Sequence, residues 1–428
     1  MTAPSPSAPG LSRQQAKTLA LASLGGALEF YDFVVFVFFA GTMGALFFPA
    51  NMPEWMRLVQ TFGIFAAGYL ARPLGGVLMA HFGDLSGRKR MFLLSILLMA
   101  VPTLLMGLLP TYAQAGVLAP ILLLVLRILQ GAAIGGEAPG AWVFVSEHVS
   151  PGHRNLACGS LSLGLLAGIL LGSLVARAVN AMLDEAQLMA WGWRLPFLIG
   201  GVFGLLAMRL RRQLQETPVF AELQQQRALS EELPLKAVVR DHPGAVALGM
   251  LLTWLLTAAV VVTILMMPTF LQGMGVSRDA ALAGNALAVL AAMVANLMAG
   301  ALADRFGAGR LLALWSLLLG IAFWLFYGEA QAGAYSPWHY AIAGSAVGLT
   351  AMIPAIALGG FPARVRFSGL SFSYNVAYAI AGGLTPVLLS LAMKNNPAAP
   401  AHYIAGVAML GVALGAWVEW RDRRSSMH

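Results

Sequence analysis

The sequence has few charged residues and only one cysteine. Asp, Glu, Lys and Arg make up 10% of its 428 residues, whereas hydrophobic residues make up 59%. Soluble domains carry about 25% charged residues, so little of this chain is left for a soluble domain. The single cysteine, Cys158, excludes a disulfide framework and a cysteine-based metal site. We interpret Cys158 as a small residue packed between helices.

Motifs of enzymes, metal sites and channels are also missing from the sequence. It contains no His-Glu-x-x-His pattern, no nucleophile elbow and no glycine-rich phosphate loop. The histidines near the ends of the apolar runs are too scattered for a metal cluster, and no filter-like loop recurs. We therefore expect neither an enzyme, nor a metalloprotein, nor a channel.

Long apolar runs dominate the chain. A membrane-spanning helix needs about 20 mostly apolar residues. Twelve such runs are predicted: 18–48, 55–82, 91–111, 118–148, 156–181, 191–209, 243–272, 279–302, 310–328, 336–361, 369–394 and 401–420. We expect an all-α membrane protein with two six-helix bundles around a central cavity. The bundles cover 18–209 and 243–420, joined by a cytoplasmic loop at 210–242, with a disordered cytoplasmic N-terminus at 1–17 and a tail at 421–428.

The basic residues set the orientation of these spans. The net charge is +8, which in a soluble protein would suggest nucleic acid as a partner. Here most of the 26 Lys and Arg residues fall on the cytoplasmic side if both termini are placed inside. The N-terminus carries no cleavable signal pattern. We therefore expect a multi-pass protein of a bacterial-type plasma (inner) membrane with both termini cytoplasmic and no nucleic-acid partner.

A short charged link between two apolar runs, Gly83-Asp84-Leu85-Ser86-Gly87-Arg88-Lys89-Arg90, has a fainter copy at 303–310. One link repeated between apolar runs in each half predicts two halves of similar build, as in transporters. Glycines recur on the fourth span (Gly131, Gly135, Gly136, Gly140) and every four residues on the fifth (Gly164, Gly168, Gly172). This spacing predicts either a sliding interface between the halves or plain close packing.

The first link resembles the signature loop of the major facilitator superfamily. Further strings resemble its metabolite:H⁺ symporter branch: 29–33 (EFYDF), 72–76 (RPLGG), 127–131 (RILQG), 135–137 (GGE), 191–197 (WGWRLPF), 216–220 (ETPVF) and 361–366 (FPARVR). The resemblance covers essentially the whole chain. It implies a transporter of α-ketoglutarate, citrate, dicarboxylates, shikimate, or proline and betaine.

Charged side chains inside the predicted spans are the candidates for proton coupling. Each costs roughly 2.5–3.5 kcal/mol at mid-membrane on insertion scales, so each needs a partner or a wet cavity. We expect Asp32 to meet Arg127 across the cavity, and Glu29, Arg72 and Glu137 to form a second cluster. Asp32 is the first candidate for the proton carrier, followed by Glu137 and Glu29. The alternative is a static buried pair that only holds helices together.

Substrate contacts are expected from both halves. Arg127 is the first candidate because its planar fork fits a carboxylate, and its alternative role is as a fixed counter-ion of Asp32. The predicted substrate-binding residues are Arg127, Arg72, Tyr31, Gln130, Asn375 and Tyr378. The second half has no mid-membrane charge, and its polar candidates also include Thr253, Thr257, Asn285, Asn296 and Tyr374. Any of these is also compatible with an ordinary contact between helices.

A conformational gate is expected at the cytoplasmic surface. The resemblance implies that the signature loop links the two halves there and stabilises the outward-open state. An acid beside the N-terminus of another helix gains from exposed N–H groups and from the macrodipole. The predicted gate residues are Asp84, Gly87, Arg88, Lys89, Glu147, Arg154, Asp304 and Arg305. For the basic members, retention of loops on the cytoplasmic side is the alternative role.

These features together predict a proton-coupled symporter that imports a small organic acid, such as a di- or tricarboxylate or a keto acid, by alternating access. The expected partners are an anionic small molecule and the lipid bilayer. No cofactor is expected other than the proton as coupling ion, and a monomer is expected to function. Two alternatives remain open: uptake of a zwitterion of the proline or betaine type, and export of a metabolite or drug. The chain ends soon after its last apolar run without heptads, which argues against osmosensing.

Overall fold

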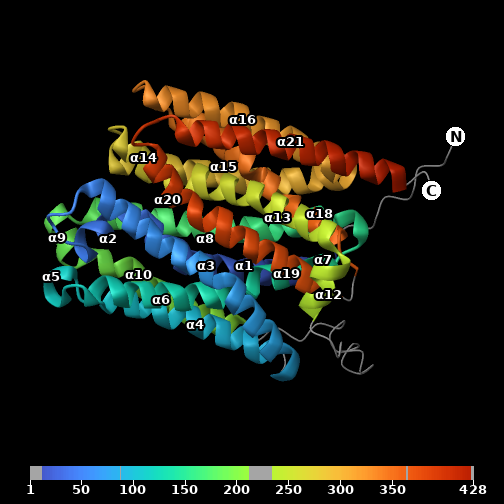
Figure 1. The fold of residues 1–428 in the computed structure, drawn as a ribbon, viewed down its shortest axis with the longest axis horizontal. Helices are drawn as coiled ribbons and strands as arrows, with labels where there is room; N and C mark the ends of the chain where they lie inside the picture. Colours follow the sequence, from blue (N-terminus) through green and yellow to red (C-terminus); the bar gives the residue numbers. More distant parts are fainter. Residues whose placement is uncertain (1–11, 87, 212–233, 363–364, 426–428) are drawn as a thin grey trace.

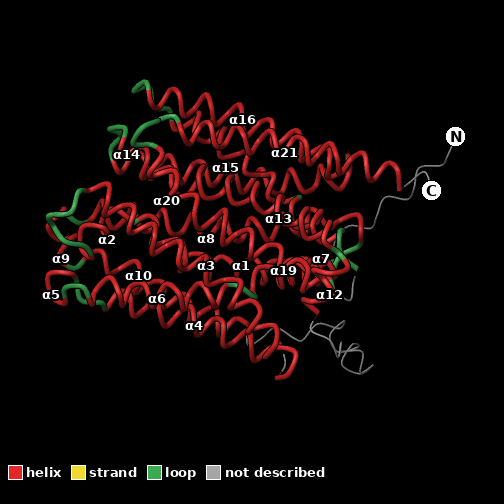
Figure 2. Tube along the Cα trace, viewed as in Figure 1, coloured by secondary structure: helices red, strands yellow, loops and turns green. Residues whose placement is uncertain are grey.

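The regular structure of the described residues is helical throughout (Figures 1 and 2). The computed structural model describes residues 12–86, 88–211, 234–362 and 365–425. Its long helices run roughly parallel to one another along the longest axis of the molecule (Figure 1). Both termini lie at one end, here called the termini-bearing end, and the opposite end carries the loops around α5 and α9 (Figure 1).

The first half contains six spans. They are α1 (Arg13–Phe38) with α2 (Ala40–Phe47), α3 (Glu54–Ser86), α4 (Arg88–Leu108), α6 (Leu118–Ile134) with α7 (Glu137–Glu147), α8 (Arg154–Met182) and α10 (Leu195–Arg211). Short helices lie between them: α5 (Tyr112–Ala115), η1 (Pro151–His153), α9 (Glu185–Ala190) and η2 (Gly192–Arg194). The fourth span is interrupted at Gly135 and Gly136, between α6 and α7.

The second half repeats this number of spans. After α12 (Pro234–Asp241), the spans are α13 (Pro243–Thr257) with η3 (Ala258–Met266) and α14 (Met267–Gly273), α15 (Arg278–Phe306), α16 (Ala308–Gln331), α17 (Pro337–Ser345) with η4 (Ala346–Ala351) and α18 (Ile353–Gly359), α19 (Arg366–Ala377) with η5 (Tyr378–Gly382) and α20 (Gly383–Ala392), and α21 (Ala399–Ser425). The segments η3 and η5 are π-helical. Such stretches occur often at functional sites.

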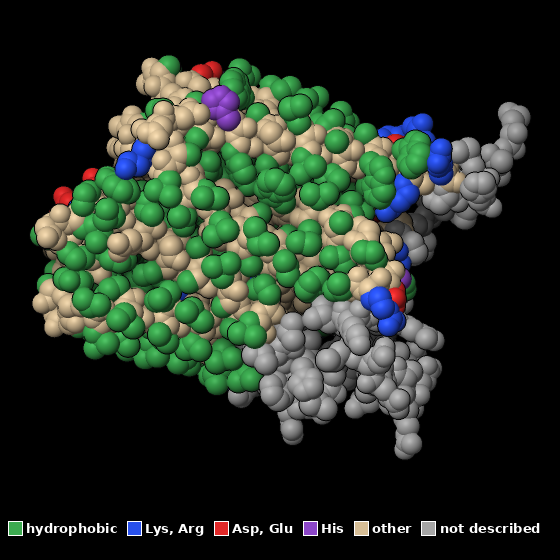
Figure 3. All heavy atoms as spheres, viewed as in Figure 1, with side chains coloured by type: hydrophobic (Ala, Val, Ile, Leu, Met, Phe, Trp, Pro, Cys, Tyr) green, Lys and Arg blue, Asp and Glu red, His purple; other side chains and the backbone are tan. Residues whose placement is uncertain are grey.

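The length and the surface of the helices fit a membrane. Within the described ranges, nine helices are long and apolar enough to cross one, and α3, α4 and α10 complete the twelve spans. Apolar side chains cover the middle of the molecule, and most of the visible Lys and Arg side chains gather at the termini-bearing end (Figure 3). The protein is therefore a multi-pass membrane protein with two six-helix bundles.

The two bundles meet along a few facing helices. The longest contact joins α8 of the first half to α15 of the second, and α3 lies against α19, η5 and α20 (Figure 1). Ser173 of α8 donates to the carbonyl of Leu282 at 3.3 Å, and Ser162 donates to the carbonyl of Thr350 at 3.4 Å. Two hydroxyls of α8 thus bond to backbone carbonyls of the second half, about three helical turns apart.

Glycines bring helices of the first half into close contact. A methyl group added at Gly131 would collide with a backbone carbonyl of α3, and one at Gly135 would collide with the carbonyl of Arg72. Gly164 and Gly168 press α8 against the backbone of α1 in the same way. These four glycines therefore pack helices within one bundle, and Gly135 in addition accepts a hydrogen bond from Asn375 of the second half.

A single added methyl group at Gly131 tests this packing. Because the backbone of α3 leaves no space there, Gly131→Ala should lower the stability of the protein by about 1–3 kcal/mol. Gly63 on α3 has nothing within 4 Å of an added Cβ, so Gly63→Ala is the matched control and should be neutral or stabilising by up to about 1 kcal/mol. Thermal unfolding in detergent would measure both, and equal melting temperatures would contradict the assignment.

Candidate functional site

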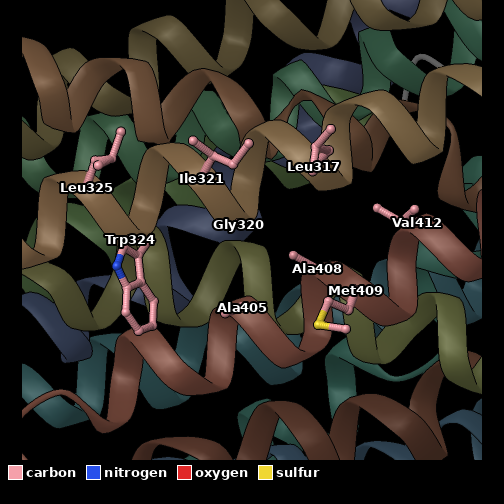
Figure 4. Close-up of a pocket in the computed structure, with 9 residues that line it drawn as sticks. All are labelled: Leu317, Gly320, Ile321, Trp324, Leu325, Ala405, Ala408, Met409 and Val412. Atoms are coloured by element: carbon pink, nitrogen blue, oxygen red, sulfur yellow. The ribbon is translucent and has the colours of Figure 1, made fainter.

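A groove on the surface of the second half has no polar side chain in its lining. It has a volume of about 310 Å³, lies between α16 and α21, and is lined only by apolar side chains and one glycine (Figure 4). Leu325 and Met409 in its lining are 60% and 74% exposed, so the groove opens to the outside of the bundle. It suits a lipid chain, and the candidate site for a polar substrate lies elsewhere.

A buried arginine surrounded by tyrosines lies where the halves meet. Arg72 lies in the middle of α3 and is fully buried. Its guanidinium carbon is 4.4 Å from the ring centre of Tyr378, 5.3 Å from that of Tyr374 and 5.5 Å from that of Tyr69. Tyr69 comes from the first half, one helical turn before Arg72, and the other two rings come from the second half. We call these four residues the arginine–tyrosine cluster.

The three rings also contact one another. Tyr69 stacks on Tyr378 with ring centres 5.0 Å apart, and Tyr374 lies 5.0 Å from Tyr378 at a tilt. Trp142 of α7 packs edge-on against Tyr374, also at 5.0 Å. Tyr374 and Tyr378 are one helical turn apart, so α19 and η5 present both rings on one face. The cluster is thus an aromatic layer shared by both bundles.

Polar atoms without hydrogen-bond partners gather at this cluster. Within the described part of the chain, the guanidinium of Arg72 has no carboxylate or carbonyl acceptor, and its polar contact is with the hydroxyl of Tyr374. The indole nitrogen of Trp142 and the amide oxygen of Asn375 are buried without a hydrogen-bond partner. Unsatisfied buried groups each cost about 1–3 kcal/mol, so their concentration at one interface indicates a binding site for a polar ligand.

Asn375 holds the two halves together beside the cluster. Its amide nitrogen donates to the carbonyl of Gly135, at the interruption of the fourth span, and to Ser371 at 3.2 Å. The break between α6 and α7 frees this carbonyl for a partner in the other half. Asn375 and Tyr378, both predicted as substrate-binding, therefore lie close to the predicted Arg72.

Arg127, the first candidate for substrate contact, is enclosed within the first half. It donates to the carbonyl of Phe33 at 3.1 Å and to Gln130 at 2.9 Å. Its guanidinium carbon lies 4.4–5.2 Å from the ring centres of three phenylalanines, Phe33, Phe36 and Phe65. The side-chain amide nitrogen of Gln130 in turn donates to the hydroxyl of Thr103 on α4 at 2.6 Å.

Asp32 is enclosed separately and does not pair with Arg127. The expectation that these two residues meet across the cavity is therefore wrong for this conformation. Asp32 packs against α10, where a methyl group added at Gly200 would collide with its carboxylate and with Thr103. Its Oδ1 atom has no hydrogen-bond partner within the described residues. Arg127 is bonded to Gln130 and Gln130 to Thr103, while Asp32 and Thr103 both lie against Gly200 of α10.

The other predicted coupling and substrate residues lie in different places. Glu137 is buried in the first turn of α7. The hydroxyl of Tyr31 donates to the carbonyl of Pro196 at 2.8 Å, so Tyr31 contacts the sixth span of its own half rather than the second bundle. The side chain of Glu29 lies outside the described residues. The predicted second cluster of Glu29, Arg72 and Glu137 therefore stays a prediction.

At the termini-bearing end, carboxylates link the halves. Asp304, in the last turn of α15, accepts bonds from the backbone N–H groups of Asn155 and Leu156 at 3.0 and 2.9 Å, at the N-terminus of α8. Glu147 lies 3.7 Å from Arg366 of α19. Among the other predicted gate residues, Arg154 and Arg305 are exposed, and the side chains at 84 and 87–89 lie outside the described residues.

The opposite end is also closed, by contacts that the sequence did not predict. Arg177 of α8 pairs with Asp279 of α15 at 2.8 Å. Arg278 donates to Thr42 of α2 at 3.2 Å, and the ammonium of Lys394 lies 3.4 Å from the ring centre of Trp55. Contacts between the halves therefore exist at both ends at once.

Two residues at the site, Tyr69 and Trp142, were not predicted from the sequence. Tyr69 precedes Arg72 by three residues and therefore shares its helix face.

No three His, Cys, Asp or Glu side chains of the described ranges converge into a metal site.

Comparison with known proteins identifies similar sequences over the whole chain. The family model described as Major Facilitator Superfamily matches residues 33–416. The chain is 31% identical over 424 residues to a proline/betaine transporter of Escherichia coli (strain K12), covering 93% of this chain and 82% of that protein. It is 30% identical over 424 residues to a glycine betaine/proline/ectoine/pipecolic acid transporter of Dickeya dadantii (strain 3937), covering 94% and 83%.

Solved structures share the fold at lower identity. A D-xylose–proton symporter is 18% identical, with a TM-score of 0.72 and coverage of 94% of this chain and 97% of that one. The xylose transporter of E. coli in a partially occluded inward-open conformation is 17% identical, with a TM-score of 0.74 and coverage of 96% and 98%.

The contact between Asp304 and α8 can be tested with the single native cysteine. Cys158 is buried one turn into α8, close to the residues that Asp304 binds. Asp304→Asn removes the charge from the helix N-terminus, so it should open the termini-bearing end and speed alkylation of Cys158 by about two- to tenfold.

Asp279→Asn provides the matched control, because it removes a carboxylate of the same helix from the opposite end. It should leave Cys158 labelling unchanged or slower. Equal acceleration by both substitutions would mean general loosening of the protein and would contradict a local gate.

Proposed function

The chain belongs to the major facilitator superfamily, and from this premise we propose that it is a proton-coupled symporter that imports small zwitterions of the proline and betaine type. It is a membrane transporter with a small-molecule substrate, and not an enzyme. Organic-acid import, the first expectation from the sequence, receives no support from the relatives. Their names give proline, betaine, ectoine and pipecolic acid, which carry an ammonium or amidinium group together with a carboxylate.

The observation that carries this proposal is the buried Arg72 guanidinium, which has no carboxylate partner among the described residues. An ionised arginine inside a membrane is stable only if something satisfies its donors. The described residues around Arg72 offer tyrosine rings and the hydroxyl of Tyr374, but no anionic acceptor. A carboxylate is the natural partner of such a planar fork, and it would arrive with the substrate, at an interface that both halves build.

Alternating access follows from the closed contacts at the two ends. Opening the termini-bearing end requires loss of the Asp304 contact with α8 and of the Glu147–Arg366 pair. Opening the other end requires loss of the Arg177–Asp279 pair. We propose that this conformation, with contacts at both ends, is an occluded one that lies between two states, each open at one end, with the cluster near the middle.

We propose Asp32 as the proton carrier. A carboxylate that is enclosed without a counter-ion is far more costly to bury charged than neutral. If α10 moves away from α1, water reaches the acid and its proton can leave. Arg127, Gln130 and Thr103 then provide a polar path on the other side of the site. Glu137 and Glu29 remain alternative carriers.

The location and orientation complete the proposal. Basic side chains gather at the termini-bearing end (Figure 3), and cytoplasmic loops carry an excess of Lys and Arg. We therefore propose a plasma membrane location with both termini cytoplasmic. A single chain supplies both sides of the cluster, so the monomer is expected to function.

Uptake by purified protein in liposomes tests the function. With an imposed inward proton gradient, glycine betaine or proline should accumulate and the process should saturate. α-Ketoglutarate and citrate should not accumulate. Accumulation of the organic acids without the zwitterions would overturn the substrate assignment, and uptake that ignores the pH gradient would overturn proton coupling.

Asp32→Asn tests the proton carrier. The amide cannot exchange a proton, so gradient-driven uptake should fall to the equilibrium level, whereas exchange of labelled for unlabelled substrate should persist. The control is Asp422→Asn, on an exposed aspartate at the end of α21 that pairs with Arg421. If the Asp32 variant still accumulates substrate against a concentration gradient, another acid carries the proton.

A further inference from the structure

The arginine–tyrosine cluster contains a bound cation that belongs to the protein itself. Three tyrosine rings lie within 5.5 Å of one guanidinium, and all four side chains are buried. Rings at this distance attract cations, at about 0.5–2 kcal/mol each when desolvated. The cluster therefore already holds a cation in a water-excluded aromatic site.

Cations differ in how strongly water hydrates them, and this affects which of them an aromatic site can bind. A guanidinium is delocalised and weakly hydrated, whereas a primary ammonium is compact and strongly hydrated. A quaternary or N-alkylated ammonium resembles the guanidinium in this respect, because no N–H or few N–H groups remain to bind water. Aromatic cages recognise quaternary ammonium ligands for this reason. The site that holds Arg72 is thus suited to the cationic end of a betaine.

The four residues of the cluster include a cation but no anionic group. The guanidinium of Arg72 has rings on its faces and the hydroxyl of Tyr374 as a polar contact, but no carboxylate or carbonyl acceptor within the described residues. The indole N–H of Trp142, which packs against Tyr374, is buried without a partner. A ligand with both a cation and a carboxylate would satisfy the rings and these donors together.

We propose, on the basis of the function proposed above, that the substrate exchanges places with Arg72. The alkylated ammonium of the zwitterion takes the position among Tyr69, Tyr374 and Tyr378. The displaced guanidinium turns to bind the substrate carboxylate. The substrate class is therefore compact zwitterions with a quaternary or N-alkylated ammonium a short distance from the carboxylate.

This exchange also links binding to the contact between the halves. Without substrate, Arg72 of α3 is held by rings from α19 and η5, so the guanidinium itself joins the two bundles. With substrate, the ligand replaces this contact and adds a carboxylate bridge. Recognition thus requires both halves to close on the ligand.

A methylation series tests the exchange. Glycine, sarcosine, N,N-dimethylglycine and glycine betaine differ only in N-methyl groups, and calorimetry on the purified full chain in detergent measures their affinities. Affinity should rise along the series. In Tyr378→Leu the gain from glycine to glycine betaine should shrink by roughly 3- to 30-fold, the range expected for one lost ring contact. Tyr378→Phe keeps the ring and should keep the gain.

The matched control is Tyr327→Leu. Tyr327 is also a buried tyrosine of the second half that stacks on another ring, Phe323, but it lies in α16 away from Arg72. Its variant should show the native gain along the series. An unchanged gain in Tyr378→Leu would overturn the exchange, and a gain reduced equally in the Tyr327 variant would overturn it too.

A second arm uses Arg72→Gln, which empties the aromatic site and removes the carboxylate partner. Glycine betaine should bind this variant at least tenfold more weakly, the range of a lost charge-assisted bidentate contact. Choline has the same trimethylammonium group and no carboxylate, so it should bind the variant at least as tightly as the native protein. Native-like betaine affinity in Arg72→Gln would overturn the proposal.

Failure of the exchange and failure of the proposed function give different results. If the native protein transports glycine betaine but the methylation gain does not depend on Tyr378, the exchange is wrong and the function stands. If the native protein neither binds nor transports any member of the series, the proposed function is wrong and the exchange falls with it.

Discussion

Ionised side chains inside a membrane need partners that water cannot supply, and the structure meets this constraint in two ways. Within the described residues, the hydrogen bonds and ring contacts of Arg127 lie in the first half: its Nη1 donates to a backbone carbonyl and to Gln130, and three phenylalanine rings surround its guanidinium. Arg72 is surrounded by rings of which two belong to the second half. Movement of one half against the other leaves the surroundings of Arg127 intact but changes those of Arg72. A charge whose partners are divided in this way couples ligand binding to motion.

The helices α8 and α15, one from each half, contact each other through polar groups at both ends of the molecule. Both end contacts use carboxylates of α15: Asp279 in its first turn and Asp304 in its last. Asp279 meets an arginine, whereas Asp304 meets only backbone N–H groups and one amide side chain at the start of α8. The two ends are therefore held by different chemistry on one pair of helices. Because each contact is short-range, either can break while the other remains.

Particular residues show how far the sequence reaches into the site. The repeated acidic link drew attention to Asp304, and helix electrostatics predicted the kind of partner, but only the fold supplies α8. The string that begins at Arg72 was found by resemblance and Asn375 as a polar side chain within an apolar run, and the structure places both residues at one interface. Asp32 and Arg127 were expected to attract one another, yet Asp32 of α1 lies against α10, whereas Arg127 of α6 contacts Phe33 and Gln130. Two residues of opposite charge need not form an ion pair when each is buried among other neighbours.

The sequence by itself determined the all-helical membrane architecture, the number of spans and the division into halves, because the length of an apolar run is enough to specify a span. It also confined the candidate charges to a few positions. Only the tertiary structure decided which face of each span meets which neighbour. In a membrane, lipid-facing and protein-facing sides of a helix are both apolar, so hydrophobic periodicity carries little information about the buried face. The meeting of Tyr69, Arg72, Tyr374 and Tyr378 depends on those faces.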